Sequence, residues 1–340
     1  MPDITFDKSG RSGVVTLDRQ HALNAVTHDM VARLSGQLDR WASDDTVERV
    51  VIHAAPGKAF SAGGDIRALY EARQNGEDQR PFFALEYATN VQIAEYPKPY
   101  IAVVDGIAMG GGVGVSFHGS HVIAGPNARF AMPEVGIGFF PDVGASYLLS
   151  RLDHHIGLYL GLTGRPILQG DLVACGLASG ATQDAPALVE ASKGDEPLAS
   201  CLAKAESEVP PGEVWENRAL IEDAFGQDSV EAILSRLTDL SATSTFAADA
   251  LDAMGRASPL SLQIAYRQLM AGKTMTLREC MEMEYRIVSH VLEGRDFYEG
   301  TRAAVIDKDR APRWEHAGIS EVSEQDLEKH FSPLAEELRL

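Results

Sequence analysis

Two glycine-rich stretches constrain most strongly what this chain can fold into. The first is Lys58–Asp65, with the sequence KAFSAGGD, and the second is Asp105–Gly114, with DGIAMGGGVG. Each follows an apolar run typical of a β-strand, so each predicts a bend of nearly bare backbone at the end of a strand. Main-chain N–H groups in such a bend can approach a substrate closely and hold the negative oxygen that develops when a carbonyl is attacked. The two stretches therefore indicate the two halves of one oxyanion hole.

A third stretch, Met132–Asp142, adds two carboxylates, Glu134 and Asp142, to an otherwise apolar segment. Burial without a cationic partner would raise the pKa of such an acid and suit it for proton transfer. Asp142 can equally be a helix N-cap, because a helix-like segment follows it. His118 and His121 have the spacing of metal ligands, but the sequence shows no further candidate ligands to complete a site, so no metal site is predicted. Backbone donors combined with acids indicate acyl chemistry.

The glycine run Gly110–Gly114 does not fit the nucleotide-binding motifs. A dinucleotide fingerprint that starts at Gly110 or Gly112 has Val115 or Phe117 at its last glycine position. The chain contains no Walker A sequence and no G-x-S-x-G nucleophile elbow. A tight turn that lets a helix pack closely on a strand is the structural alternative to an oxyanion bend.

Several segments resemble the crotonase (enoyl-CoA hydratase/isomerase) superfamily, and the likeness runs over most of the chain. They are Phe60–Arg67, Phe130–Asp142, Met283–Arg286, Asp296–Gly300 and Ile306–Asp309. The glycine motifs are typical of the whole superfamily, whereas the Phe-Pro-Asp ending at Asp142 and the C-terminal segments are typical of its hydrolase branch. The resemblance implies an α/β fold of the crotonase type, a spiral of ββα turns with a C-terminal helical region.

The resemblance also implies roles for single residues. It places N–H donors at Ala62 and Gly111, and it makes Glu134 the general base for water or a nucleophile, two routes that the sequence does not separate. Asp142 would hold the 3-hydroxyl group of the substrate or relay a proton. The further implied substrate-binding residues are Glu86, Gly63, Gly64, Asp65 and Gly110, and Asp65 is expected to fix its loop by bonding backbone.

Gly114 departs from the pattern of the hydratases, which have a glutamate two places after the glycine triplet. Since one of the two hydratase acids is missing, simple hydration of an enoyl-CoA is disfavoured. We expect hydrolysis of a short hydroxyacyl-CoA thioester, and the resemblance implies 3-hydroxyisobutyryl-CoA, as in valine breakdown. A hydratase or isomerase with a substitute acid stays an alternative. So does a non-catalytic acyl-CoA binding subunit, which the retained Glu134 disfavours.

The net charge of −19 and the pI near 4.9 disfavour nucleic acid or a membrane as a partner. Coenzyme A is itself anionic, so a local cluster of basic side chains has to offset the overall charge. The candidates are Lys58, Arg67 and Lys98 near the motifs, and Lys273, Arg302, Lys308 and Arg310 near the C-terminus. No cofactor is expected beyond the coenzyme A that enters with the substrate, and a homo-oligomer stays open.

The cysteines Cys175, Cys201 and Cys280 are scattered and form no C-x-x-C, so the sequence predicts neither a disulfide framework nor a zinc site. The N-terminus lacks the basic region and the apolar stretch of a secretory signal, and no apolar run is long enough to span a membrane. We therefore expect a cytoplasmic location.

Apolar runs joined by helical patterns predict an α/β architecture, although the pattern alone does not choose between a doubly wound sheet and a spiral. Strands are predicted at Val14–Leu17, Val47–His53, Tyr100–Val104 and His121–Ala124, and helices at Thr27–Ala42, from Ser258-Pro259 onward and at Thr276–Leu292. The expected buried stripe of the second helix is Leu262, Ala265, Leu269 and Met270.

Composition suggests three consecutive regions. We expect a spiral core with the active site at residues 1–185, a boundary segment at 186–211 that carries short helices, and a helical region at 212–340. The boundary segment is rich in alanine, serine, acidic residues and proline.

Overall fold

The computed structural model describes residues 2–340, which form two compact units that alternate along the chain. Unit 1 consists of the residues up to Gly64, Ala88–Phe130 and Ile167–Trp215. Unit 2 consists of Asp65–Tyr87, Ala131–Pro166 and Glu216–Leu340. The sequence predicts consecutive regions instead, because periodicity reports local structure and not which distant segments pack together. The last change of unit, after Trp215, lies close to the predicted start of the helical region.

The strands form two sheets, and consecutive strands from β3 to β8 alternate between them. The larger sheet has the order β1-β2-β3-β5-β7-β10 and the smaller one β4-β6-β8-β9. The larger sheet contains β1 (Ile4–Ser9), β2 (Ser12–Leu17), β3 (Arg49–Ala54), β5 (Tyr100–Val104), β7 (His121–Ala124) and β10 (Gly180–Ala181). The smaller sheet contains β4 (Ala59–Ser61), β6 (Ile107–Met109), β8 (Arg129–Ala131) and β9 (Ile167–Leu168). The predicted α/β class is confirmed, and the repeated strand pairs are those of the expected spiral.

The core of unit 1 lies on the larger sheet. All five residues of β5 are buried, and β5 pairs in parallel with β3 and β7, as expected of an apolar strand covered on both faces. The predicted strands Tyr100–Val104 and His121–Ala124 match β5 and β7. Helix α8 (Ala185–Lys193) covers part of this sheet, and the side chains that pack there are Val51, Ile101, Val103, Ile123, Ala185, Leu188 and Val189.

The first helix of unit 1 forms where its pattern predicts it. Helix α1 (His28–Ala42) begins after the N-cap Thr27, whose hydroxyl accepts from the N–H of Met30. Its buried residues are Met30, Val31, Leu34, Leu38 and Trp41. The other helices of unit 1 are α4 (Gly111–Gly114), α7 (Gln169–Ala174) and α9 (Leu198–Ala205), while α3 (Arg80–Ala94) and α10 (Glu213–Glu216) each include residues of both units.

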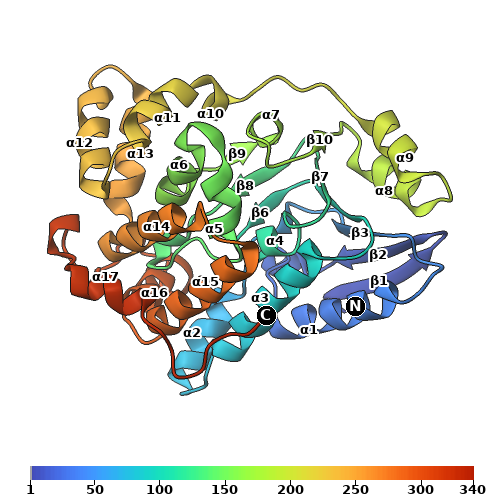
Figure 1. Ribbon diagram of the computed structural model, residues 1–340, viewed down its shortest axis with the longest axis horizontal. Helices are drawn as coiled ribbons and strands as arrows, with labels where there is room; N and C mark the ends of the chain where they lie inside the picture. The colour runs from blue at the N-terminus through green and yellow to red at the C-terminus, as the bar shows by residue number, and fades with distance from the viewer. Residues whose placement is uncertain (1) are drawn as a thin grey trace. The chain divides into compact units, whose positions relative to one another are not determined.

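Unit 2 is helical. Its helices are α2 (Ile66–Gln74), α5 (Ala145–Leu148), α6 (Ile156–Thr163), α11 (Arg218–Phe225), α12 (Val230–Ser241), α13 (Thr245–Arg256), α14 (Pro259–Gly272), α15 (Leu277–Val291), α16 (Asp296–Thr301) and α17 (Glu324–Phe331), with a π-helical turn η5 (Arg302–Ile306). Helices α12 and α13 lie side by side (Figure 1). None of the helices within residues 2–340 combines the length and the apolar character that crossing a membrane requires.

The two helices predicted in this unit are confirmed, with one correction. Ser258 caps α14, whose first residue is a proline, and Thr276 with Glu279 forms a capping box at α15. Met270 is 40% exposed and does not belong to the buried stripe of α14. It directly follows Leu269, which already occupies the inward position of that helical turn.

Candidate active site

The two glycine bends lie side by side in unit 1. Strands β4 and β6 pair in parallel, so the chain leaves both strands in the same direction. A Cβ added at Gly112 would lie 2.4 Å from the carbonyl oxygen of Ser61, so only glycine permits this approach. Gly63 has a φ of +107° and Gly110 a φ of +44°, conformations that favour glycine. The bare residues of each stretch are therefore needed for the contact between the bends.

The N–H groups of the bends are not equally available to a substrate. The N–H of Ala62 donates to the carbonyl oxygen of Leu23 at 3.0 Å, so the expectation that Ala62 supplies an oxyanion donor is wrong. Two residues later, the N–H of Gly64 has no hydrogen-bond partner within residues 2–340. Gly111 is the first residue of α4, a position whose N–H has no partner inside the helix. The candidate donor pair is therefore Gly64 and Gly111.

Four of the carboxyl groups that are buried in unit 2 form one electrostatic cluster around Asp142. Glu86 of α3 is 2% exposed, Glu134 at the start of the 3-10 turn η2 (Glu134–Ile137) is 7% exposed, and Asp142 before α5 is 4% exposed. Glu284 of α15 is 0% exposed. Burial raises the pKa of both Glu86 and Glu134, and the negative charge of Asp142 raises it further, so the three predicted acids interact with one another.

Burial raises the pKa of each carboxyl group in this cluster, because the charged form loses its hydration. The pKa of Asp142 is raised to about 7 and that of Glu284 to about 8. The pKa values of Glu86 and Glu134 also lie well above the usual 4.5. The hydroxyl of Tyr87 donates to Oδ2 of Asp142 at 2.9 Å and acts in the opposite direction, lowering the pKa of that carboxyl. With values of about 7 and about 8, Asp142 and Glu284 can gain and lose protons near neutral pH.

Backbone contacts fix the turn that carries Glu134. The N–H of Ser258 donates to the carbonyl oxygen of Val135 at 3.0 Å. Gly300 of α16 packs against the same turn so closely that an added Cβ would lie 2.2 Å from the carbonyl oxygen of Ile137. The C-terminal segment around Gly300 therefore supports Glu134 through backbone contacts.

Three side chains hold the corner that carries Asp142. Val143 has a φ of +52°, a conformation that is strained for a β-branched residue. The carboxyl group of Glu284 accepts hydrogen bonds from two N–H groups that follow Val143 in the chain, those of Gly144 at 2.7 Å and Ser146 at 2.9 Å. Gln268 of α14 donates to the carbonyl oxygen of the preceding proline, and Tyr87 holds the carboxyl group itself. The surrounding helices thus impose a backbone shape that the local sequence disfavours.

The buried acids differ in whether their oxygens have partners. Both oxygens of Glu284 accept hydrogen bonds. By contrast, Oε1 of Glu86 and Oε2 of Glu134 are buried and have no hydrogen-bond partner within residues 2–340. Buried polar atoms are rarely left unpaired, so Glu86 and Glu134 have the character of groups that bind a substrate or water. Glu284 has the character of a positioning group.

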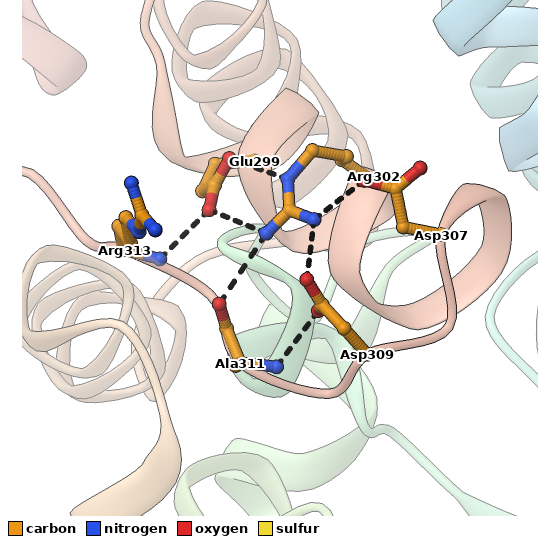
Figure 2. Close-up of polar contacts among 6 residues, drawn as sticks. All are labelled: Glu299, Arg302, Asp307, Asp309, Ala311 and Arg313. Carbon is orange, nitrogen blue, oxygen red and sulfur yellow. Dashed lines mark hydrogen bonds and ion pairs between the residues drawn. The ribbon is translucent and has the colours of Figure 1, made fainter.

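Arg302, a candidate for binding coenzyme A, is engaged in a network within unit 2 (Figure 2). Its guanidinium donates to Glu299, Asp307 and Asp309 and to the carbonyl oxygen of Ala311. These contacts use the whole guanidinium and pin the chain that follows η5. Arg302 therefore acts as a clamp for the C-terminal segment and is not available as a phosphate-binding group.

Other predicted residues also have structural contacts. Asp65 caps α2 by accepting from the N–H of Ala68 at 3.1 Å, which agrees with a residue that bonds backbone. Lys98 donates to the carbonyl oxygens of Trp41 and Asp44 and so holds a loop of unit 1.

Residues 2–340 contain no group of three or more His, Cys, Asp or Glu side chains that could hold a metal ion.

Tyr87, Gln268 and Glu284 are site residues that the sequence motifs do not predict. Glu284 belongs to the resembling segment Met283–Arg286 but has no role assigned there, and Tyr87 directly follows the predicted Glu86. A signal for Glu284 exists in the helical pattern, because it lies on the same face of α15 as Cys280 and Ile287, both fully buried. A carboxyl group in such a stripe requires hydrogen-bond partners.

The chain matches the family model described as enoyl-CoA hydratase/isomerase over residues 12–331. It is 39% identical over 345 residues to the mitochondrial 3-hydroxyisobutyryl-CoA hydrolase of Rattus norvegicus, covering 98% of this chain and 89% of that protein. It is 40% identical over 347 residues to the enzyme of the same name from Homo sapiens, with the same coverage.

Two solved structures resemble the whole chain. One is a carnitinyl-CoA dehydratase from Mycobacterium thermoresistibile, with a TM-score of 0.94, 34% identity and coverage of 100% of this chain and 99% of that one. The other is an enoyl-CoA hydratase from Rhodobacter sphaeroides, with a TM-score of 0.93, 36% identity and coverage of 100% of both chains. The names of these similar proteins therefore include a hydrolase, a dehydratase and a hydratase.

Proposed function

The chain belongs to the enoyl-CoA hydratase/isomerase family, and we propose that it hydrolyses a short hydroxyacyl-CoA thioester. The proposed substrate is 3-hydroxyisobutyryl-CoA, and the products are 3-hydroxyisobutyrate and coenzyme A, a reaction of valine breakdown. The names of the rat and human relatives support this substrate.

One observation favours hydrolysis over hydration. Of the two glutamates that the hydratases use, this chain has one and lacks the other. Glu134 is buried with an unpaired oxygen. At the place where the hydratases have their other glutamate, this chain has Gly114. A Cβ added there would lie 2.8 Å from both polar atoms of the Asn90 amide, so a larger side chain has no room unless Asn90 moves. Hydration by paired glutamates therefore lacks one of its acids.

In the proposed reaction, the thioester carbonyl oxygen accepts hydrogen bonds from the N–H groups of Gly64 and Gly111. These donors gain strength as the oxygen becomes negative, and one such donor is worth roughly 3 kcal/mol in the transition state. The two bends are packed tightly, because Gly112 of the second lies against the backbone of Ser61 in the first. The donors therefore need no rearrangement when the charge develops.

Glu134 serves the acyl carbon in one of two ways. As a general base it takes a proton from water, whose oxygen attacks the carbonyl carbon. As a nucleophile it forms a mixed anhydride that water then hydrolyses. In both routes the carbon–sulfur bond breaks, the acyl carbon gains an oxygen from water, and the thiolate takes up a proton. Asp142, with a pKa of about 7, holds the 3-hydroxyl group or relays that proton.

We propose that no cofactor is needed, so treatment with a chelator should leave the rate unchanged. A cytoplasmic location and a homo-oligomer also stay proposals, and the names of the rat and human relatives place those proteins in mitochondria.

The test is release of coenzyme A from 3-hydroxyisobutyryl-CoA, followed with a thiol reagent. A parallel assay follows loss of the crotonyl-CoA chromophore, which a hydratase would consume. The proposal predicts rapid thiol release and no comparable loss of the chromophore. Rapid loss of crotonyl-CoA without thiol release would favour the hydratase, and inactivity in both assays with retained acyl-CoA binding would favour the binding subunit.

A further inference from the structure

A buried amide without partners lies beside the second glycine bend. Asn90 of α3 is 0% exposed, and neither its Nδ2 nor its Oδ1 forms a hydrogen bond within residues 2–340. Both polar ends of one buried side chain are thus unpaired. Such groups are nearly always hydrogen-bonded in folded proteins, so the amide requires a ligand or an ordered water.

The amide lies against the helix that carries one of the proposed oxyanion donors. A Cβ added at Gly114 would lie 2.8 Å from Nδ2 and from Oδ1 of Asn90 and 3.0 Å from its Cγ. Gly114 ends α4, and Gly111 begins it, so the two glycines are about one helical turn apart. All three residues belong to unit 1. Glycine at 114 therefore makes room for the amide within one helical turn of a proposed donor to the thioester.

The chemistry of an amide limits what this side chain can do. It carries no charge at any pH near neutral, so it is neither an acid nor a base, but it offers N–H donors at one end and a carbonyl acceptor at the other. The matching ligand is an oxygen that both donates and accepts a hydrogen bond. A hydroxyl group and a water molecule share this property, whereas a carboxylate only accepts.

We propose that Asn90 is a substrate-contacting residue whose amide binds a hydroxyl-type oxygen of the reactants. Two sources of that oxygen exist in the reaction: the 3-hydroxyl group of the acyl chain and the water that cleaves the thioester. This inference rests on the proposed function and adds a residue to it. It also gives a reason for glycine at position 114, because a larger side chain there would displace the amide.

Two variants test the proposal on a pair of substrates. Asn90→Leu replaces the amide with an apolar side chain of similar size, and Gly114→Ala places a methyl group against the amide while residue 90 is unchanged. Each is assayed with 3-hydroxyisobutyryl-CoA and with isobutyryl-CoA, which lacks the hydroxyl. The control is Thr163→Val, another buried polar-to-apolar change, whose hydroxyl donates to the carbonyl oxygen of Tyr159. Circular dichroism checks that every variant is folded.

If Asn90 binds the 3-hydroxyl, both test variants should lower kcat/KM for the hydroxylated substrate by at least about tenfold and leave isobutyryl-CoA within about twofold. If it binds the attacking water, the rates on both substrates should fall by a similar factor of at least about ten. Wild-type rates on both substrates in either folded variant would overturn the proposal and leave a structural water as the ligand of the amide. The control should match the wild type on both substrates.

A failure of the proposed function is distinguishable from a failure of this inference. If the wild type releases no coenzyme A, an attacking water is ruled out as the ligand and the 3-hydroxyl remains. Calorimetry then compares the Kd of 3-hydroxyisobutyryl-CoA with that of isobutyryl-CoA in the wild type and in Asn90→Leu. An increase of about tenfold in Kd for the hydroxylated compound alone would support the contact. Equal changes for the two compounds, or none, would refute it.

Discussion

At the residue scale, hydrogen bonding distinguishes buried acids that stabilise the backbone from buried acids whose oxygens have no protein partner. Glu284 uses both of its oxygens on backbone N–H groups. Glu134 has an unpaired buried oxygen and a pKa well above the usual value because of burial and the nearby Asp142. Identical side chains therefore have different roles in one cluster, and the difference lies in what their atoms contact.

Glu134→Gln should lower kcat for thioester hydrolysis by at least about 10², because an amide can act neither as base nor as nucleophile here. Circular dichroism should show an unchanged fold, since the two side chains have nearly the same shape. Glu208→Gln is a matched control at an exposed position and should retain the wild-type rate. A folded Glu134→Gln variant with wild-type turnover would show that Glu134 is neither the general base nor the nucleophile.

Tyr87→Phe tests the protonation of Asp142. The hydroxyl of Tyr87 stabilises the charged form of Asp142, whereas burial destabilises it and raises the pKa to about 7. Without that hydroxyl the pKa of Asp142 should rise further, while Glu86, Glu134 and Glu284 still face it. If ionised Asp142 is needed, kcat/KM rises with pH through this pKa, and the acid limb of the profile should move to higher pH in the variant. An acid limb that stays in place would show that Asp142 does not control it.

At the element scale, α15 positions the residues of the active site by fixing the backbone corner around Val143. The left-handed conformation of Val143 persists because Glu284 bonds the two N–H groups that follow. In Glu284→Gln, an NH₂ group faces one of those N–H groups, so one hydrogen bond is lost and the corner should relax. We expect kcat to fall at least about tenfold, since small misplacements of catalytic groups are costly. Steady-state kinetics would contradict this if kcat were unchanged.

The same variant has a stability effect whose size depends on pH. The pKa of Glu284 is about 8 in the folded protein and near 4.5 without burial, so between these values the folded state holds a proton that the unfolded state has released. Its contribution to the free energy of unfolding therefore falls as pH rises through that window, by up to about 3 kcal/mol between about pH 5.5 and pH 8. Glutamine does not titrate, so Glu284→Gln should destabilise the protein more at the lower pH. Denaturant unfolding at both pH values measures this, and a larger loss at the higher pH would contradict it.

Several elements could be read from the sequence because their signals are local. Helix α1 shows helical spacing and a capping threonine, β5 is a fully buried run, and β7 has three buried apolar residues after His121. The choice of oxyanion donor could not be read in this way. It depends on a hydrogen bond from Ala62 to Leu23, which lies in a distant left-handed turn, and no local pattern reports such a pairing. The strained corner at Val143 was missed for a similar reason, because its supports come from α14 and α15.

At the scale of the whole molecule, the chain alternates between its units where the sequence predicts consecutive regions. The bends with the donors belong to unit 1, and the buried acids belong to unit 2. Short runs of distinctive composition locate the two bends and the segment with Glu134 and Asp142, whereas the sequence assigns no role to Glu284. The changes of unit carry no such run, and the alanine-rich segment 186–211, which contains most of α8 and all of α9, lies within unit 1 and is not a boundary.

Hydroxyl recognition by a thioester hydrolase is tested by the ratio of kcat/KM for 3-hydroxyisobutyryl-CoA to that for isobutyryl-CoA, both followed by release of coenzyme A. A site that hydrogen-bonds the hydroxyl leaves buried polar atoms unpaired when the hydroxyl is absent, so we expect a ratio of at least roughly 10². Asp142→Ala should remove most of that preference while the chain still folds. Equal values for the two thioesters would contradict hydroxyl recognition, and failure of the wild type to release coenzyme A from either one would contradict the hydrolase itself.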